Sequence, residues 1–231
     1  MSKRLNVEFH CHTIYSNDSL THPDTLVETC HRRGIDRVVI TDHNTIAGAV
    51  IAQEMDPGRV ILGEEIMTRQ GELLAAFVIE EIPAGLDVFE AIELLRRQNA
   101  FISVSHPFDR TRSGHWEAEV LLEIAPLVDA IEVFNARCFP PRFNQIAQDF
   151  AHLENIPGTV GSDAHAPFEL GQATMLLPEF EDADGLRGVL GQVEFKTRPS
   201  KPWVRLVSRW AVLQKALNPS LIPAESFAPR S

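Results

Sequence analysis

The chain alternates short apolar runs with amphipathic stretches over most of its length. Runs such as residues 38–40 and 101–104 are hydrophobic or nearly so at every position, which is typical of strands covered by helices on both faces. The predicted strands are, in chain order, residues 5–12, 37–43, 59–67, 72–79, 100–106, 130–135, 159–165, 173–177 and a short 193–196. This alternation predicts an α/β protein.

Helical periodicity fills most of the gaps between these strands. The predicted helices are residues 23–33, 45–54, 87–98, 117–127, 141–154 and 184–190, followed by a basic amphipathic helix over 202–217. Pro23 suits a first helical turn, Gly34 suits the end of the same helix, and Asp87 can cap the third. Alternating strands and helices predict a parallel sheet, and seven or eight strands favour a closed barrel with its site at the carboxyl ends of the strands.

Side chains that bind divalent metals well fall where the predicted strands end. The set comprises His10, His12, Asp18, His43, Glu65, Glu72, His106, Asp163 and His165. No short stretch of sequence holds more than three of them, so only a fold that gathers strand ends can bring them together. Imidazoles clustered with carboxylates are how proteins hold several divalent cations for hydrolysis. The sequence therefore predicts a multinuclear metal hydrolase.

Spacing within the motifs supports this interpretation, although each motif alone has a structural alternative. His10 and His12 are two residues apart and share one side of a strand, and Asp163 and His165 repeat that spacing. A single histidine at a strand end is usually a hydrogen-bonded structural residue, and a lone Asp18 would more often cap a turn. Glu65 is favoured as the ligand over Glu64, which should face the other way, with the reverse order left open.

Composition narrows the functional classes. The 231 residues suit one large domain, and a net charge of −11 argues against a nonspecific grip on duplex nucleic acid. The sequence has no run of about 18 apolar residues, so we expect no membrane-spanning helix. The N-terminus lacks the apolar core of a signal peptide, and three cysteines without paired spacing suit a reducing cytoplasm. We therefore expect a cytoplasmic protein with a small substrate and leave its oligomeric state open.

Charge is distributed unevenly along the chain. Residues 1–195 carry a net charge of −17, whereas residues 196–231 carry +6. We expect a barrel over residues 1–198 and a C-terminal basic helix and tail over residues 199–231 that packs on it. We expect the apolar stripe of that helix to be buried, and a membrane-surface or partner-binding helix is the alternative. The stripe consists of Val204, Leu206, Val207, Trp210, Leu213 and Leu217.

Together, these motifs resemble the polymerase-and-histidinol-phosphatase (PHP) domain phosphoesterases over about residues 5–165. The resemblance is carried by His10-x-His12 with Asp18, Thr41-Asp-His43, Gly63-x-Glu65, Ser105-His106-Pro107 and Ser162-Asp163-x-His165. It implies a single-domain α/β fold, a distorted seven-stranded TIM-like β/α barrel, holding two or three divalent ions of manganese, iron or zinc. Much of the family has a further histidine on the strand after Gly-x-Glu. This chain has Glu72 there, which we take as a substitute ligand and which is harder than imidazole.

The resemblance and the charge of the predicted ligands favour phosphate chemistry. The expected reaction is hydrolysis of a small phosphate ester, such as a phosphorylated metabolite, a nucleotide or an oligonucleotide end, by a metal-bound hydroxide without a side-chain nucleophile. Loops after two strands offer Arg110, Arg112 and Arg137 as phosphate-binding residues, although ordinary solvated loop charge explains each of them equally well. Asn135, at the end of a strand, is a further candidate to orient a ligand or the substrate. Glu132, which ends the same strand, would lie behind the ligands and support them.

Two rival functions remain. An amidohydrolase-like C–N hydrolase also begins a barrel with His-x-His, but its metal pair is often bridged by a modified lysine. The lysines of this chain are confined to positions 3, 196, 201 and 215, so the barrel body has none. A non-catalytic metal-binding regulatory module is the other rival, and the nearly complete ligand set argues against it.

Overall fold

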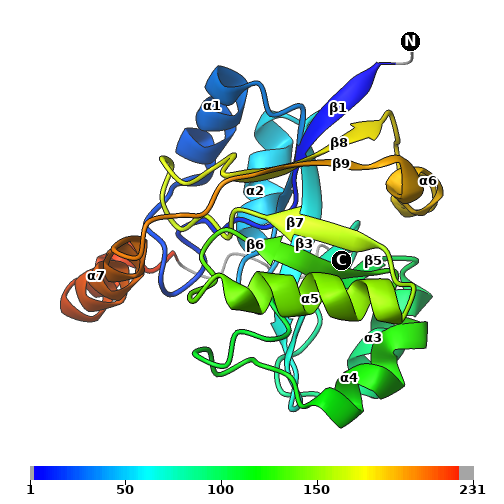
Figure 1. The fold of residues 1–231 in the computed structure, drawn as a ribbon. Helices are drawn as coiled ribbons and strands as arrows, with labels where there is room; N and C mark the ends of the chain where they lie inside the picture. The colour runs from blue at the N-terminus through cyan, green and yellow to red at the C-terminus, as the bar shows by residue number, and fades with distance from the viewer. Residues whose placement is uncertain (1–2, 224–231) are drawn as a thin grey trace.

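A single nearly closed sheet forms the centre of the computed structural model, which describes residues 3–223 (Figure 1). The nine strands lie in the order β7-β6-β5-β4-β3-β2-β1-β8-β9. Their bounds are β1 Arg4–Glu8, β2 Arg37–Ile40, β3 Val60–Met67, β4 Glu72–Ala76, β5 Phe101–Val104, β6 Ala130–Asn135, β7 Gly158–Gly161, β8 Ala173–Pro178 and β9 Glu194–Thr197. The predicted class, an α/β barrel in one domain, is confirmed.

Helices follow most of the strands, as the periodicity predicts. They are α1 Pro23–Arg33, α2 Ala47–Met55, α3 Val88–Arg97, α4 Ala118–Ile124, α5 Arg142–Leu153, α6 Ala183–Val189 and α7 Val204–Leu217, with short 3₁₀ turns η1 Ala125–Leu127, η2 Leu190–Gln192 and η3 Pro219–Leu221. The predicted caps are confirmed. Pro23 is the first residue of α1, Gly34 ends it at φ 62°, and the Asp87 carboxylate accepts the Phe89 N–H at 3.1 Å.

The expectation of a wholly parallel sheet is wrong. β4 runs antiparallel to both β3 and β5, and β8 runs antiparallel to β1 and β9, so the sheet is mixed. The link between β3 and β4 spans only residues 68–71, too short for the crossover that a parallel pair needs. The sheet also has nine strands, where the resemblance implies seven.

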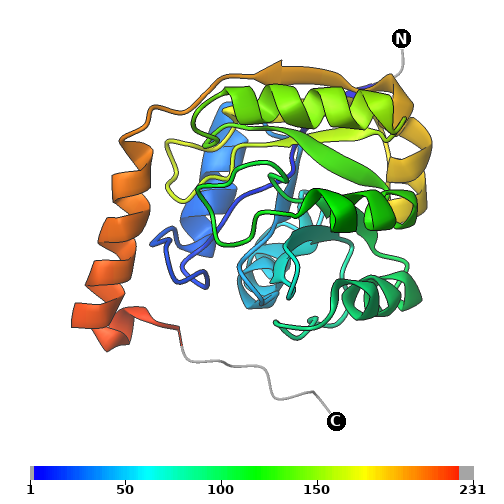
Figure 2. The ribbon, with the colours of Figure 1, turned by 60° about the horizontal axis from the view of Figure 1, so that its bottom comes forward.

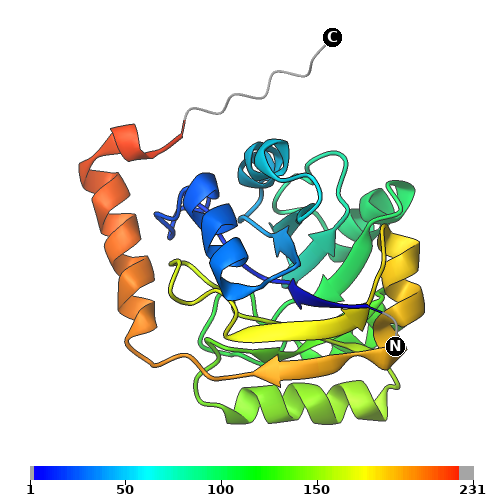
Figure 3. The same ribbon diagram turned by 90° about the horizontal axis from the view of Figure 1, so that it is seen from above.

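Alternating side chains along the strands fill two cores. Val39 of β2 joins Val7 and Phe9 in the larger core, whereas its neighbours Val38 and Ile40 pack among residues of α1 and α2 in the smaller one. Both faces of β2 are therefore covered, which explains its uninterrupted apolar sequence. Seen from above in Figure 3, α1 and α2 lie on one side of the sheet and α5 on the other.

The barrel draws together where β1 and β7 end. Cys11, beyond the end of β1, forms a parallel bridge with Ala164, beyond the end of β7, and the His12 N–H donates to the Ala164 carbonyl at 2.9 Å. His43 forms a similar isolated bridge with Glu65. Several predicted strands are thus shorter than expected, because their last residues leave the regular ladder to form the site.

Helix α7 stands at one flank of the barrel, on the side where β1 and β7 end (Figure 2). Val204, Ala211 and Lys215 are buried against the body, but the expected burial of the apolar stripe is wrong. Most of that stripe points to solvent, with exposed fractions of 62% for Leu206, 56% for Trp210, 48% for Leu213 and 66% for Leu217. Polar contacts, described below, hold the helix instead. The division of the chain into a barrel over residues 1–198 and a C-terminal segment over residues 199–231 stays a prediction. The part of that segment from residue 224 onward lies outside the described residues.

Among the helices of residues 3–223, none combines the length and the apolar character needed to cross a bilayer.

Candidate metal centre

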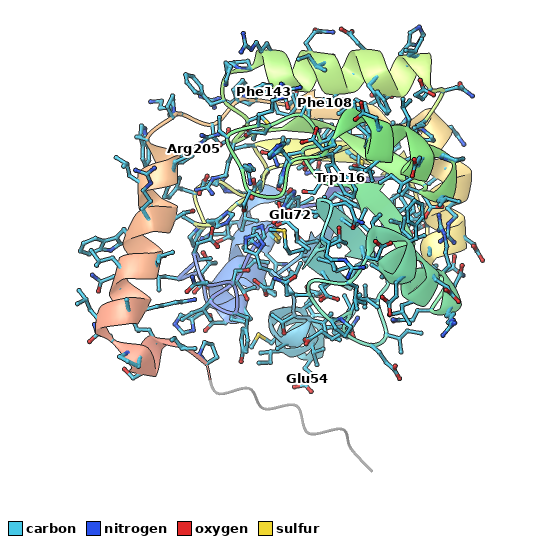
Figure 4. All side chains as sticks on the ribbon, turned by 90° about the horizontal axis from the view of Figure 1, so that it is seen from below. Glu54, Glu72, Phe108, Trp116, Phe143 and Arg205 are labelled. Carbon is cyan, nitrogen blue, oxygen red and sulfur yellow. The ribbon has the colours of Figure 1, made fainter. Side chains whose placement is uncertain are left out.

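The nine predicted metal ligands converge at the end of the barrel where β1, β2 and β7 terminate. We call them the donor cluster: His10, His12, Asp18, His43, Glu65, Glu72, His106, Asp163 and His165. Figure 4 views this end, with Glu72 near the middle of the face and α7 along one flank. Seven members are at most 6% exposed, whereas the side chains of Asp18 and His43 are each 27% exposed.

Glu65 is the central carboxylate of the donor cluster. Its Oε2 lies 3.3 Å from His10 Nε2, 3.4 Å from His12 Nε2 and 3.1 Å from His43 Nδ1. Its Oε1 lies 3.1 Å from His106 Nε2. Glu64 points away, and its Oε2 accepts the Ile82 N–H at 3.0 Å. The alternation of side chains along β3 therefore puts Glu65 inside the barrel and Glu64 outside it.

Asp163 forms a second point of convergence. Its Oδ1 lies 3.3 Å from His12 Nε2, 3.7 Å from His10 Nε2 and 3.4 Å from His165 Nδ1. Asp163 has a φ of 51°, a left-handed backbone that a non-glycine residue adopts only at a cost. That conformation lets a carboxylate and the imidazole two residues later reach the same space after β7 has ended.

Asp18 and Glu72 complete the cluster. Asp18 lies in the loop after β1, and its Oδ2 is 2.8 Å from His165 Nε2 while its Oδ1 is 3.6 Å from His43 Nε2. Glu72 begins β4, and its Oε2 is 3.4 Å from His106 Nε2. Gly114 packs directly on the Glu72 carboxylate, where a β-carbon would collide with it. The structure thus places Glu72 with the other donors, although the motif predicts histidine there.

The donor set fits divalent metal ions. Three groups each bring one nitrogen or oxygen per residue within 4.8 Å of the others: His12, His43 and His165; His10, His12 and Asp163; and His43, Glu65 and Glu72. Four of these atoms are buried without a hydrogen-bond partner, namely His10 Nε2, His12 Nε2, Glu65 Oε2 and Asp163 Oδ1. A buried polar atom without a partner costs roughly 1–3 kcal/mol. Four such atoms converging on one space are what bound cations would satisfy.

Side chains behind the cluster orient its imidazoles. Glu132 Oε1 lies 2.9 Å from His10 Nδ1, and its Oε2 accepts the His106 N–H at 2.9 Å. A carboxylate on one ring nitrogen leaves the other nitrogen of His10 free for a metal. The Asp163 carbonyl and the Arg137 guanidinium both lie against His165 Nδ1, at 2.8 Å and 2.9 Å, so this ring is also held from behind. Glu132 thus occupies the supporting position that the sequence suggested.

Burial and neighbouring charge set the ionisation of the cluster. Burial alone would raise the pKa of Glu65, but His10 and His43 outweigh it and hold that pKa well below its usual range. Burial would also raise the pKa of Asp163, but Arg112 and His10 outweigh it and hold that pKa well below its usual range. Burial, reinforced by His165 and His43, lowers the pKa of His12 to about 3. Both carboxylates are therefore ionised and His12 is neutral at pH 7, the forms that coordinate metals.

The four predicted substrate-binding residues occupy different surroundings. Arg112 pairs with Asp163 and lies 3.4 Å from Asp109, with its side chain 21% exposed. Arg110 is exposed. Asn135 Nδ2 donates to Glu132 at 3.1 Å and to Asp163 at 3.2 Å. The guanidinium of Arg137 is buried and contacts Glu169 at 2.8 Å, His165 Nδ1 at 2.9 Å and the Val204 carbonyl at 2.9 Å. Of the three arginines, Arg112 is thus the one that pairs with a carboxylate of the cluster and keeps part of its side chain exposed.

Two supporting residues were missed by sequence reasoning. Ser16 accepts from the His43 N–H at 3.0 Å and lies 3.0 Å from His12 Nδ1, and a serine in a polar loop gives no signal of such a role. Lys215 is the other. It shares a helix face with Val204 and Ala211, at intervals of seven and four residues, so the burial of its position could have been inferred.

Comparison with known proteins agrees with the geometry. The model of the PHP domain matches residues 8–106, and a PHP-associated model matches residues 141–190. An uncharacterised protein of Methanocaldococcus jannaschii, MJ0417, is 35% identical over 178 residues, which cover 76% of this chain and 71% of that protein. The chain belongs to the PHP family. The family is metal-dependent, and the His, Asp and Glu side chains of the donor cluster could bind metal.

Solved structures share the PHP fold at low sequence identity. A protein from Bifidobacterium adolescentis, assigned as a metal-dependent phosphoesterase, is 19% identical with a TM-score of 0.60, covering 83% of this chain and 98% of its own. The lesion-specific endonuclease PfuEndoQ from Pyrococcus furiosus is 16% identical with a TM-score of 0.55, covering 87% of this chain and 60% of its own. At these identities the likeness establishes the architecture alone.

Proposed function

We propose that this PHP protein is a metal-dependent hydrolase of small phosphate esters, with two or three divalent ions of manganese, iron or zinc held by the donor cluster. The convergence of four buried, unpartnered donor atoms from His10, His12, Glu65 and Asp163 is the observation that carries the proposal. When bound, the ions would polarise phosphoryl oxygens and acidify water at neutral pH. The chain's own residues would hold the ions, bind the phosphate and fix the geometry.

Arg112 is the proposed phosphate contact. Its guanidinium reaches the edge of the cluster beside Asp163 and keeps part of its surface exposed, and a guanidinium can donate two parallel hydrogen bonds to phosphate. Arg110, on the same loop, is exposed and remains a second candidate. For Arg137 we propose a positioning role, because its guanidinium already contacts Glu169, His165 and α7. Asn135 is proposed to hold Asp163 in place.

The named structural neighbours support phosphate esters as the substrate class. One is assigned as a phosphoesterase and the other is an endonuclease, so both names denote cleavage of a phosphate ester. The net charge of −11 favours a small ester or a strand end over a long duplex, whose phosphates the acidic body would repel. We propose a phosphorylated metabolite, a nucleotide or an oligonucleotide end.

A metal-dependent panel tests the proposal. The purified protein would be stripped with a chelator, reloaded with Mn²⁺, and assayed for phosphate release from p-nitrophenyl phosphate, bis-p-nitrophenyl phosphate, sugar phosphates and 5′-nucleotides. We expect turnover that disappears with the chelator, returns with the metal and is lost in Arg112→Met for anionic substrates. Hydrolysis of N-acyl amino acids without release from any phosphate ester would contradict the proposal and favour the C–N hydrolase.

A further inference from the structure

Lys215 is an unusual lysine because it is only 3% exposed. It lies near the end of α7, some 200 residues from the loop that it contacts. Taking an ammonium group out of water is costly, so a buried lysine needs strong compensating contacts. Its Nζ donates to the Ile14 carbonyl and to the Ser16 carbonyl, both at 2.6 Å. The other polar residues of α7 are exposed or half-buried.

The two carbonyls belong to the turn that connects His12 with Asp18. The Ser16 N–H donates to the Thr13 carbonyl at 3.0 Å, and the Ile14 N–H donates to the Thr21 carbonyl at 2.7 Å. These bonds shape the turn from within, whereas Lys215 holds its carbonyl side from outside. The turn begins and ends with members of the donor cluster, so its conformation sets where both side chains lie.

Ser16 transmits the position of this turn to the cluster. Its hydroxyl donates to Asp42 Oδ1 at 2.6 Å, and because that uses its only proton, the hydroxyl must accept from its other neighbours. One is His12 Nδ1 at 3.0 Å, and another is the His43 N–H at 3.0 Å. This arrangement places the His12 proton on Nδ1 and leaves Nε2, the atom facing Glu65 and Asp163, as a lone pair.

Asp42 fixes the other side of the turn. Its Oδ1 accepts the Thr13 N–H and its Oδ2 accepts the Thr13 hydroxyl, both at 2.6 Å. The carboxylates of Asp42 and Asp18 also attract the Lys215 ammonium, against the burial that lowers its pKa. The residues from Thr13 to Ser16 are therefore held between a buried acid from the end of β2 and a buried base from α7.

We infer that Lys215 is a positioning residue of the metal centre, acting through the Ile14–Ser16 carbonyls on His12 and Asp18. Helix α7 is then part of the site although it supplies no donor to the metal. A lysine serves here because its ammonium can satisfy two carbonyls at once, which an apolar side chain cannot do. Arg137 makes a parallel link from His165 Nδ1 to the Val204 carbonyl at the other end of α7.

The test compares Lys215→Met with Lys201→Met, an exposed lysine of the same C-terminal segment. Lys215→Met keeps most of the length of the side chain and removes its charge and its donors. We expect the affinity for Mn²⁺, measured by titration of the stripped protein, to fall by roughly 10–100-fold, the usual effect of losing a group that orients a ligand. Amide hydrogen exchange in a peptide covering residues 13–21 should become at least about tenfold faster, because the Lys215 ammonium no longer opposes local opening of the turn. Lys201→Met should change neither.

Lys215→Arg and Ser16→Ala extend the test if Lys215→Met folds poorly. Lys215→Arg keeps the charge and donors and should recover part of the Mn²⁺ affinity. Ser16→Ala removes the hydroxyl that orients His12 and should weaken Mn²⁺ binding while leaving exchange near Ile14 slow.

Unchanged Mn²⁺ affinity in folded Lys215→Met, or in Ser16→Ala where Lys215→Met does not fold, would overturn the inference. The functional meaning of the metal rests on the proposed function, but the binding and exchange measurements do not. A wild-type protein that binds Mn²⁺ yet hydrolyses no phosphate ester would refute the proposed function alone.

Discussion

The two faces of β3 carry adjacent glutamates that are both fully buried and behave in opposite ways. Burial opposed by His10 and His43 holds the pKa of Glu65 well below its usual range. Glu64 has the Ile82 N–H as a partner, and burial raises its pKa to about 8. Burial alone therefore does not make a metal site. What makes one is the convergence of imidazoles from several strands on the inner carboxylate.

The largest effect should come from the inner glutamate. Glu65→Gln removes a negative charge, and three imidazole nitrogens lie within 3.4 Å of one oxygen of that carboxylate. We therefore expect kcat/KM for a phosphate ester to fall by more than about a hundredfold. Residues that only support a ligand typically cost roughly 10–100-fold. Glu64→Gln is the matched control and should stay within about twofold at pH 7. Equal losses in the two variants would mean that the comparison between the faces of β3 has no catalytic meaning.

Glu72 should have the next largest effect, on metal preference. It stands beside His106 where the family pattern has an imidazole, so it makes this side of the cluster harder than the side formed by His12, His43 and His165. Glu72→His should shift the ratio of Zn²⁺ to Mn²⁺ affinity toward zinc by about tenfold, which is only about 1.4 kcal/mol. Competitive loading followed by elemental analysis measures the ratio. A ratio that stays the same would show that Glu72 does not contact the metal.

The smallest effect concerns stability and the outer glutamate. Because the folded-state pKa of Glu64 is about 8 and the ordinary value is 4.5, an unfolded chain ionises this group first as pH rises. Stability from Glu64 is therefore fully present below about pH 4.5 and is lost as pH rises toward 8, at up to about 1.4 kcal/mol per pH unit.

Glu64→Gln cannot ionise and should lose less stability than the wild type between pH 5 and pH 8. Urea unfolding at several pH values would measure the difference, with Glu90→Gln, an exposed glutamate of α3, as the control. Parallel curves for Glu64→Gln and the wild type would show that Glu64 is already ionised in the folded protein.

The sequence by itself determined the elements and the donor residues. Periodicity predicted α1 and β6 to the residue and every other strand to within a few residues, because apolar spacing is a local property of the chain. It also predicted nine metal-binding side chains at strand ends, and the structure brings these nine residues together at one end of the barrel. The choice of Glu65 over Glu64 followed from the two-residue period of a strand.

Only the tertiary structure decided how these parts meet. The direction of β4 depends on a short turn and on pairing with β5, which residue patterns in a buried strand do not encode. The prediction that the apolar stripe of α7 is buried is wrong, because buried polar groups hold the helix and most of its hydrophobic side faces solvent. The contacts of Lys215 with Ile14 and Ser16 join residues about 200 positions apart. Contacts between such distant residues depend on the nearly closed barrel, which brings α7 against the loop that follows β1.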